Sequence, residues 1–166
     1  MKTEKEVNSD IIEYLLYAER DVHEVLKITN EYPDLTIPQA YEIQNGLLEK
    51  RLKENGTEKV GVKLGLTSKA KQEMMGVNEP IYGYLHADMM ENSDRAISCS
   101  ELIHPKIEPE IAFFIEEDIT GDNITESDIL NATKYIAPAL EIIDSRYKDF
   151  KFTLVDFCAG KCFAIG

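Results

Sequence analysis

Apolar and charged residues alternate along the first third of the chain with the period of an α-helix. Apolar residues recur at helical spacing over residues 11–26 with acids between them, which predicts an amphipathic helix. The sequence YPD at residues 32–34 breaks this pattern. A second helix is predicted next, because TIPQ at residues 36–39 forms a capping box and apolar residues continue to the Asn-Gly pair at 55–56.

After Gly56 the pattern changes to shorter segments with the period of a β-strand. Residues 59–66 alternate in this way and contain two glycines, which often mark the close approach of a backbone or a ligand. The Thr-Ser pair at residues 67–68 can cap a short helix that runs to Met75. A further short strand is predicted over residues 81–85.

Three more elements complete the predicted fold. A longer strand is expected over residues 106–115, and Pro109 within it indicates an edge strand or the beginning of a strand. A helix is expected from Thr125 to about Tyr135. It is followed by a buried apolar strand over residues 136–144 that a single acid interrupts.

The order of these elements, with helices first and mainly strands afterwards, indicates an α+β fold. The chain has 166 residues, 43% of them hydrophobic and 30% charged, which suits one compact domain with a sizeable core. We expect an N-terminal helical scaffold at residues 1–56 and a β-rich portion at residues 57–166. Both are expected to belong to one continuous domain.

Net charge narrows the classes of partner. The chain carries 18 Lys+Arg against 31 Asp+Glu, a formal net charge of −13. This charge argues against duplex nucleic acid and anionic membrane surfaces, which repel an acidic protein, and it permits the binding of cations. No apolar run approaches the roughly 20 residues needed to span a bilayer. The charged N-terminal sequence MKTEKE lacks an apolar segment, so no secretory signal is expected.

The cysteines indicate a reducing compartment. Cys99, Cys158 and Cys162 are odd in number and form no CxxC motif, so they do not suggest a disulfide framework. We therefore expect a cytoplasmic protein with chemically inert thiols.

Three acids in apolar surroundings are the first candidates for chemistry. Glu108 and Glu110 lie two residues apart on a predicted strand and so point to the same side, and Glu141 stands between Leu140 and Ile142. Burying a carboxylate without a partner costs several kcal/mol, so Glu141 needs a cation or hydrogen-bond donors. A divalent metal would relieve the repulsion of three converging carboxylates, and all-oxygen ligation selects Mg²⁺, Mn²⁺ or Ca²⁺ over zinc. The alternative, which spacing alone favours, is a solvated strand face with Glu141 paired to a Lys or Arg.

Other polar residues leave more than one interpretation open. Lys63, between Val62 and Leu64, is either an ordinary surface lysine or a general acid/base whose pKa a nearby cation and desolvation would lower. Asp88 could cap a turn or orient a substrate. The three histidines show no metal-ligand spacing, so no metal role is expected for them. The sequence contains neither a phosphate-binding loop nor a nucleophile elbow.

Several longer motifs, in this order along the chain, resemble one enzyme family. They are VGVKLGLTSKA at residues 60–70, MGV at 75–77, PIYG at 80–83, LIHPKIEPEIA at 102–112 and PALEIIDSR at 138–146. They are similar to the 2-oxopent-4-enoate hydratase / 4-oxalocrotonate decarboxylase family of the fumarylacetoacetate hydrolase superfamily. The resemblance covers nearly the whole chain.

The resemblance assigns roles to these positions. It implies a fumarylacetoacetate-hydrolase-like β-rich core, a cytoplasmic lyase, and a substrate that is a small unsaturated 2-oxo or 2-hydroxy carboxylic acid. It also implies a homo-oligomer or a hydratase–decarboxylase complex. The metal, Mg²⁺ or Mn²⁺, would be held by Glu108, Glu110 and Glu141. The catalytic candidates are Lys63 and Asp88, and the substrate-binding candidates are Thr67 and Ser68.

Within the family, the sequence favours the decarboxylase branch of meta-cleavage catechol degradation. KITNEYP at residues 27–33 and DSRYKDFKF at 144–152 are similar to that branch, with the hydratase as the alternative. The chain departs from the family after Asp156. Family members continue through an Ala-Asp-Asn-x-Ser stretch and a long β-rich part, whereas FCAGKC stands at residues 157–162. We therefore expect a fold that is incomplete at its C-terminus, and a non-catalytic fragment or partner subunit is a further alternative.

Overall fold

The computed structural model describes residues 2–75, 77–92, 94–148 and 153–156, and the backbone of 161–165. The α-helices are α1 (Glu4–Arg20), α2 (Ile37–Asn55), α3 (Lys69–Met75) and α4 (Glu126–Ala132). The strands are β1 (Lys59–Gly65), β2 (Ile81–His86), β3 (Pro105–Ile115), β4 (Thr133–Ser145) and β5 (Lys161–Ile165). Short 3-10 turns lie at Ile28–Asn30, Ala87–Met89 and Cys99–Glu101. The predicted α+β class is confirmed.

Helices α1 and α2 pack against each other and form the main apolar core. Each begins with a capping box, formed by Thr3 and Glu6 in α1 and by Thr36 and Gln39 in α2, as predicted for the second helix. Gly46 allows the close approach, because a Cβ at this position would overlap the side chain of Ile12. The core residues of these two helices are Ile11, Ile12, Leu15, Leu16, Ala18, Ala40, Ile43 and Leu47.

The first helix lies earlier in the chain than its apolar spacing predicted. It ends at Arg20 rather than at residue 26, and Val22 adopts a left-handed backbone conformation with φ of 47°. Val25 is still buried, but it forms a parallel bridge with Tyr147, with its N–H donating to the Arg146 carbonyl at 2.8 Å. The apolar spacing therefore extends past the end of α1. The apolar residues of α1 pack against α2, whereas Val25 packs against the segment after β4.

The strands form two antiparallel sheets in the described residues. β1 pairs with β2, and the second sheet has the order β3-β4-β5. β3 lies at an edge, so the position predicted from Pro109 is confirmed for this part of the chain. α4 ends at Ala132 and β4 begins at Thr133, earlier than predicted. The β-branched and aromatic residues at 133–136 suit a strand better than a last helical turn.

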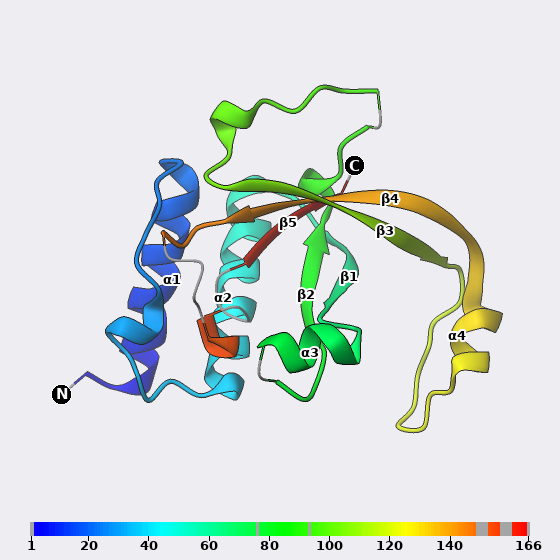
Figure 1. Cartoon of the computed structure of the whole chain (residues 1–166), viewed down its shortest axis with the longest axis horizontal. Coiled ribbons are helices and arrows are strands. Elements are labelled where there is room, and N and C mark those ends of the chain that lie inside the picture. The colour runs from blue at the N-terminus through cyan, green and yellow to red at the C-terminus, as the bar shows by residue number, and fades with distance from the viewer. Residues whose placement is uncertain (1, 76, 93, 149–152, 157–160, 166) are drawn as a thin grey trace.

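Figure 1 shows how the parts are arranged. β3 and β4 form a long ribbon that crosses β1 and β2, with α1 and α2 together toward one end and α4 at the other. A partly buried ion-pair network joins the helices to the ribbon, since Glu19 of α1 accepts from Arg51 of α2 and, at 2.6 Å, from buried Arg146. None of the helices in the described residues has the length and hydropathy needed to cross a lipid bilayer.

Candidate metal and lysine site

Three carboxylates meet on one face of the β3–β4 ribbon. Alternation along β3 puts Glu108 and Glu110 on the same side, and the antiparallel register pairs Glu108 with Glu141. One oxygen from each carboxylate lies within 4.8 Å of the others. The predicted convergence of these three acids is therefore present in the structure.

Lys63 of β1 brings a positive charge to this cluster. Its Nζ lies 2.7 Å from Oε1 of Glu110 and 2.6 Å from Oε2 of Glu141. The Lys63 side chain is 9% exposed and that of Glu141 is 2% exposed, so both charges lie inside the protein. The interpretation in which Glu141 pairs with a lysine is thus realised together with the convergence of the acids. The two interpretations, set out as alternatives, are compatible.

The carboxylates change the acidity of the lysine. Burial lowers the pKa of Lys63, but hydrogen bonds and charge interactions with Glu110 and Glu141 outweigh it and raise the pKa above its ordinary value. The interpretation of Lys63 as a general acid/base depended on a nearby cation and desolvation to lower this pKa, whereas the described groups that contact Nζ are carboxylates. Lys63 is therefore a protonated ammonium group that the two carboxylates hold in place.

A second lysine lies at the rim of the cluster. Nζ of Lys71, on α3, is 3.7 Å from Oε2 of Glu108, and both side chains are substantially exposed. The helix that carries Lys71 begins at Lys69, after a short connection from the end of β1 at Gly65. The Oγ of Ser68 accepts from the Lys71 N–H at 3.2 Å, and Nε2 of Gln72 donates to the Leu66 carbonyl at 2.8 Å.

The predicted substrate-binding pair lies in this connection between β1 and α3. Thr67 and Ser68 are both exposed, and the described contact of the Ser68 hydroxyl is the cap on α3. That contact gives Ser68 a structural role. The assignment of both residues to substrate binding stays a prediction.

Asp88 is placed in a different environment from the carboxylate cluster. It lies in the 3-10 turn after β2, where it contacts Nδ1 of His86 and accepts from Nδ2 of Asn55 at 2.7 Å. Burial raises the pKa of Asp88, but the hydrogen bonds from His86 and Asn55 outweigh it and hold the pKa below its usual range. The described contacts of Asp88 thus join β2 to the end of α2. Its catalytic role stays a prediction.

Sequence reasoning missed the partner of Asp88. The strand predicted over residues 81–85 stopped one residue short of His86, which is the last residue of β2 and is buried. Its lack of metal-ligand spacing hid this contact. The His-x-Asp spacing at residues 86–88, directly after a strand, was the available signal.

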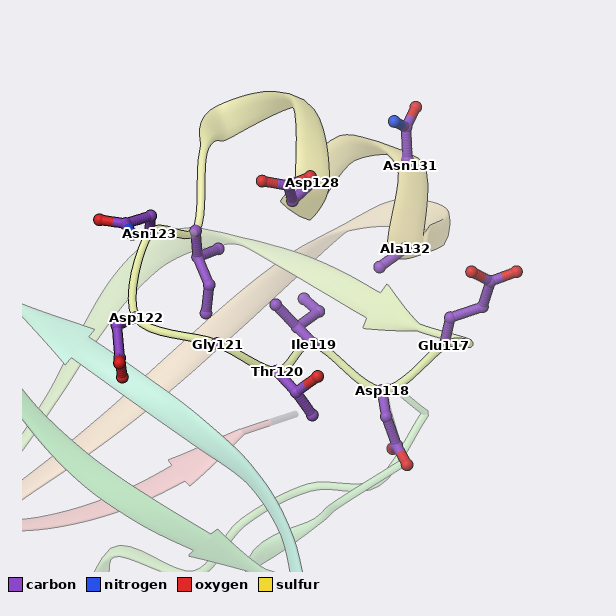
Figure 2. A pocket seen from close by; sticks show the side chains of 11 residues that line it. Glu117, Asp118, Ile119, Thr120, Gly121, Asp122, Asn123, Asp128, Asn131 and Ala132 are labelled. Atoms are coloured by element: carbon purple, nitrogen blue, oxygen red, sulfur yellow. The ribbon is translucent and has the colours of Figure 1, made fainter.

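A separate hollow of about 510 Å³ lies beyond the end of β3. Figure 2 shows that the loop after β3 and helix α4 line it, with several acidic side chains around it. Asp128 is one of them, and its carboxylate is engaged in the capping box of α4 with Thr125. The hollow does not include the carboxylate cluster, whose residues lie on the strands themselves.

Comparisons with known proteins agree with the resemblance seen in the motifs. No family model matches the chain. It is 43% identical over 150 residues to a 4-oxalocrotonate decarboxylase of Pseudomonas putida, covering 90% of this chain and 56% of the relative. It is 41% identical over 136 residues to a 2-hydroxypent-2,4-dienoate hydratase of Pseudomonas putida, covering 81% of this chain and 61% of that protein.

A solved structure shows the same relationship in three dimensions. The 4-oxalocrotonate decarboxylase from Pseudomonas putida G7, complexed with magnesium and adipate, matches the whole chain with a TM-score of 0.88 and 36% identity. This chain covers 64% of that one and 56% of the decarboxylase relative above. The resemblance to the decarboxylases and hydratases is therefore confirmed, for a chain that spans little more than half the length of a decarboxylase relative.

Proposed function

We infer, from the relationship of this chain to the 4-oxalocrotonate decarboxylases and dienoate hydratases, that it contributes to a metal-dependent lyase. The proposed reaction is the decarboxylation of 2-oxohex-3-enedioate (4-oxalocrotonate) to 2-hydroxypenta-2,4-dienoate in catechol meta-cleavage degradation. The observation that carries this proposal is the meeting of Glu108, Glu110 and Glu141 around Lys63. The similarity to a decarboxylase complexed with magnesium and adipate supports it.

The donor set fits a hard divalent cation. All three candidate ligands are carboxylates, and their oxygens lie within 4.8 Å of one another. Oxygen-only ligation is what Mg²⁺ and Mn²⁺ take in proteins. The ammonium of Lys63 already contacts two of the three acids, which supports the binding of a further positive charge by this cluster. We propose that Glu108, Glu110 and Glu141 hold Mg²⁺ or Mn²⁺.

The chain's own residues suggest a division of labour in the reaction. A bound divalent cation supplies Lewis-acid polarisation of the 2-oxo group, which makes that carbonyl an electron sink. Loss of CO₂ from the distal carboxylate leaves its electron pair in the conjugated system. Lys63, held as an ammonium next to the carboxylates, is the proposed donor of the proton that completes the dienol product.

The hydratase is the second candidate reaction. The chain is also 41% identical to a dienoate hydratase, and hydration would use the same carbonyl polarisation before water adds to the conjugated alkene. A non-catalytic role is less well supported, because the acids and the lysine remain assembled. We further propose a cytoplasmic setting and a homo-oligomer or hydratase–decarboxylase complex.

The activity test uses the purified chain with Mg²⁺ or Mn²⁺ and both substrates. Release of CO₂ from 2-oxohex-3-enedioate without hydration of 2-hydroxypenta-2,4-dienoate identifies the decarboxylase, and the reverse identifies the hydratase. Failure of both reactions contradicts catalysis by this chain.

The metal site is tested separately by thermal unfolding. Millimolar Mg²⁺ is expected to raise the melting temperature, because an ion that binds only the folded state stabilises it. Glu141→Gln should abolish the rise, whereas Glu116→Gln should keep it, because exposed Glu116 pairs with Lys134 away from the cluster. An unchanged melting temperature in the unsubstituted protein would contradict the metal site.

A further inference from the structure

Two lysines contact the carboxylate cluster in different ways. Lys63 is 9% exposed and contacts two carboxylates at 2.6 and 2.7 Å. Lys71 is 56% exposed and has one longer contact, 3.7 Å to Glu108. A contact of that length between exposed groups holds a lysine only weakly. Lys63 is thus fixed at the cluster, and the side chain of Lys71 can exchange its partner.

The backbone of Lys71 is nevertheless well placed. Its N–H donates to Ser68 Oγ at 3.2 Å, and the next residue, Gln72, donates to the carbonyl of Leu66 at 2.8 Å. These bonds tie α3 to the end of β1, the strand that carries Lys63. Lys71 therefore presents a flexible side chain from a fixed point at the rim of the site.

The charges of the site show where a second positive charge is needed. The three glutamates and Lys63 carry a formal charge of −3 + 1 = −2. A divalent cation brings this sum to zero, and it would take up Glu108, the present partner of Lys71. The single carboxylate of a monocarboxylic ligand can then bind the cation. A second carboxylate on the same ligand has to find another positive group near three glutamates.

We propose that Lys71 determines specificity by receiving the distal carboxylate of a dicarboxylic acid bound at the cluster. This inference rests on the proposed function and deepens it, because 2-oxohex-3-enedioate has two carboxylates and 2-hydroxypenta-2,4-dienoate has one. Lys71 separates the two candidate reactions by the charge of the ligand. The interaction is a charge-assisted hydrogen bond at the rim of the site.

The test measures ligand binding, independently of turnover. Isothermal titration with adipate, a six-carbon dicarboxylate, and with hexanoate, its monocarboxylate counterpart, is carried out in millimolar Mg²⁺. Lys71→Met is expected to weaken adipate binding by roughly 10-fold and to change hexanoate binding by less than about twofold. Lys71→Arg should retain most of the adipate affinity. Lys134→Met is the matched control, since Lys134 is also 56% exposed and pairs with Glu116 outside the site.

The outcomes separate this inference from the proposed function. Unchanged adipate binding in Lys71→Met overturns the role of Lys71, as does an equal loss for both ligands. An adipate affinity no greater than the hexanoate affinity in the unsubstituted protein overturns it too. Failure of Mg²⁺ to raise the melting temperature in the absence of any organic acid instead contradicts the metal site on which the proposed function depends.

Discussion

The helical layer and the β3–β4 ribbon treat their apolar residues in opposite ways. In α1 and α2, the apolar stripes face each other and are buried. In the ribbon, the face opposite the carboxylates is mainly apolar, with Asp144 at one end, and much of it is exposed. Residues of this face with about half or more of their surface exposed are Ile107, Ile111, Phe113, Ile115, Ile136 and Leu140.

The difference shows which part of the molecule covers its own apolar residues. The apolar stripes of α1 and α2 are buried against each other and against residues of other segments that join the same core, Val25, Ile28, Ile81 and Tyr147. A ribbon has two faces, and this one uses the first for Glu108, Glu110 and Glu141. The second face is as apolar as the faces of strands that other elements cover on both sides. The helical layer should therefore govern stability, and the ribbon should govern chemistry and association.

Shortening a core side chain should show the difference between the two regions most clearly. Ile43→Ala in α2 is expected to cost about 2–5 kcal/mol of unfolding free energy, because it leaves a cavity in the helical core. Ile111→Ala removes the same atoms from the exposed ribbon face and should cost less than about 0.5 kcal/mol. Urea unfolding followed by circular dichroism measures both. Similar losses would show that the ribbon face is as well packed as the helical core.

Removing the lysine of the cluster should have the next largest effect. Lys63→Met leaves buried Glu141 without this cation and should cost about 2–3 kcal/mol, below the value for a fully buried pair because Glu110 is partly exposed. The double variant Lys63→Met/Glu141→Gln should recover much of the loss in the same urea experiment. No recovery would mean that the loss came from packing rather than charge.

The same pair predicts a pH dependence. The pKa of Lys63 is raised in the folded protein, so its contribution is complete below the ordinary lysine pKa of 10.5 and is lost as pH rises through the folded-state value. The unsubstituted protein should therefore lose stability more steeply above about pH 10.5 than Lys63→Met does. Parallel alkaline profiles for the two proteins would contradict the raised pKa.

Two matched helix caps sharpen the comparison between regions. Thr36→Ala removes the capping box of α2 and should cost about 1 kcal/mol of global stability. Thr125→Ala removes the corresponding box of α4, a seven-residue helix at the end of the ribbon, and should mainly increase local opening. Hydrogen exchange resolves the two effects. A global effect of Thr125→Ala would place α4 in the same cooperative unit as α2.

The smallest effect on stability is expected on the exposed face. Ile111→Lys should change the unfolding free energy by less than about 0.5 kcal/mol, because the side chain is already largely in solvent. It should reduce concentration-dependent association, since a charge on an apolar edge strand opposes pairing with another chain. Sedimentation velocity at several concentrations measures this. Unaltered association would mean that other surfaces mediate it.

The sequence predicted the elements whose signals are local. The capping box at Thr36 and Gln39 and the shared face of Glu108 and Glu110 follow from spacing alone. The pairing of Lys63 with Glu110 and Glu141 does not, because it joins two separate sheets and no period along the chain encodes it. Only the resemblance of the motifs to a known enzyme family placed Lys63 and these glutamates in one site.

The misplaced boundaries have the same origin. The first helix was extended to residue 26 because Val25 continues the apolar spacing, yet this residue is buried against Tyr147, far away in the sequence. The ion pair between Glu19 and Arg146 could not be predicted either, since both are charged residues in segments that were predicted separately. The Cys158 prediction and most of the departure at residues 157–162 lie outside the described residues, as does the side chain of Cys162. The division at residue 56 stays a prediction.

The position of Lys63 has a consequence for the order in which the protein and its ligands assemble. The ammonium is supplied by β1 and balances buried charge on β3 and β4, so these strands carry their own counter-ion when they come together. The fold can form before any ion arrives from solution. An incoming cation then shares Glu110 and Glu141 with an ammonium that is already in place, so it enters a site whose negative charge is partly balanced beforehand.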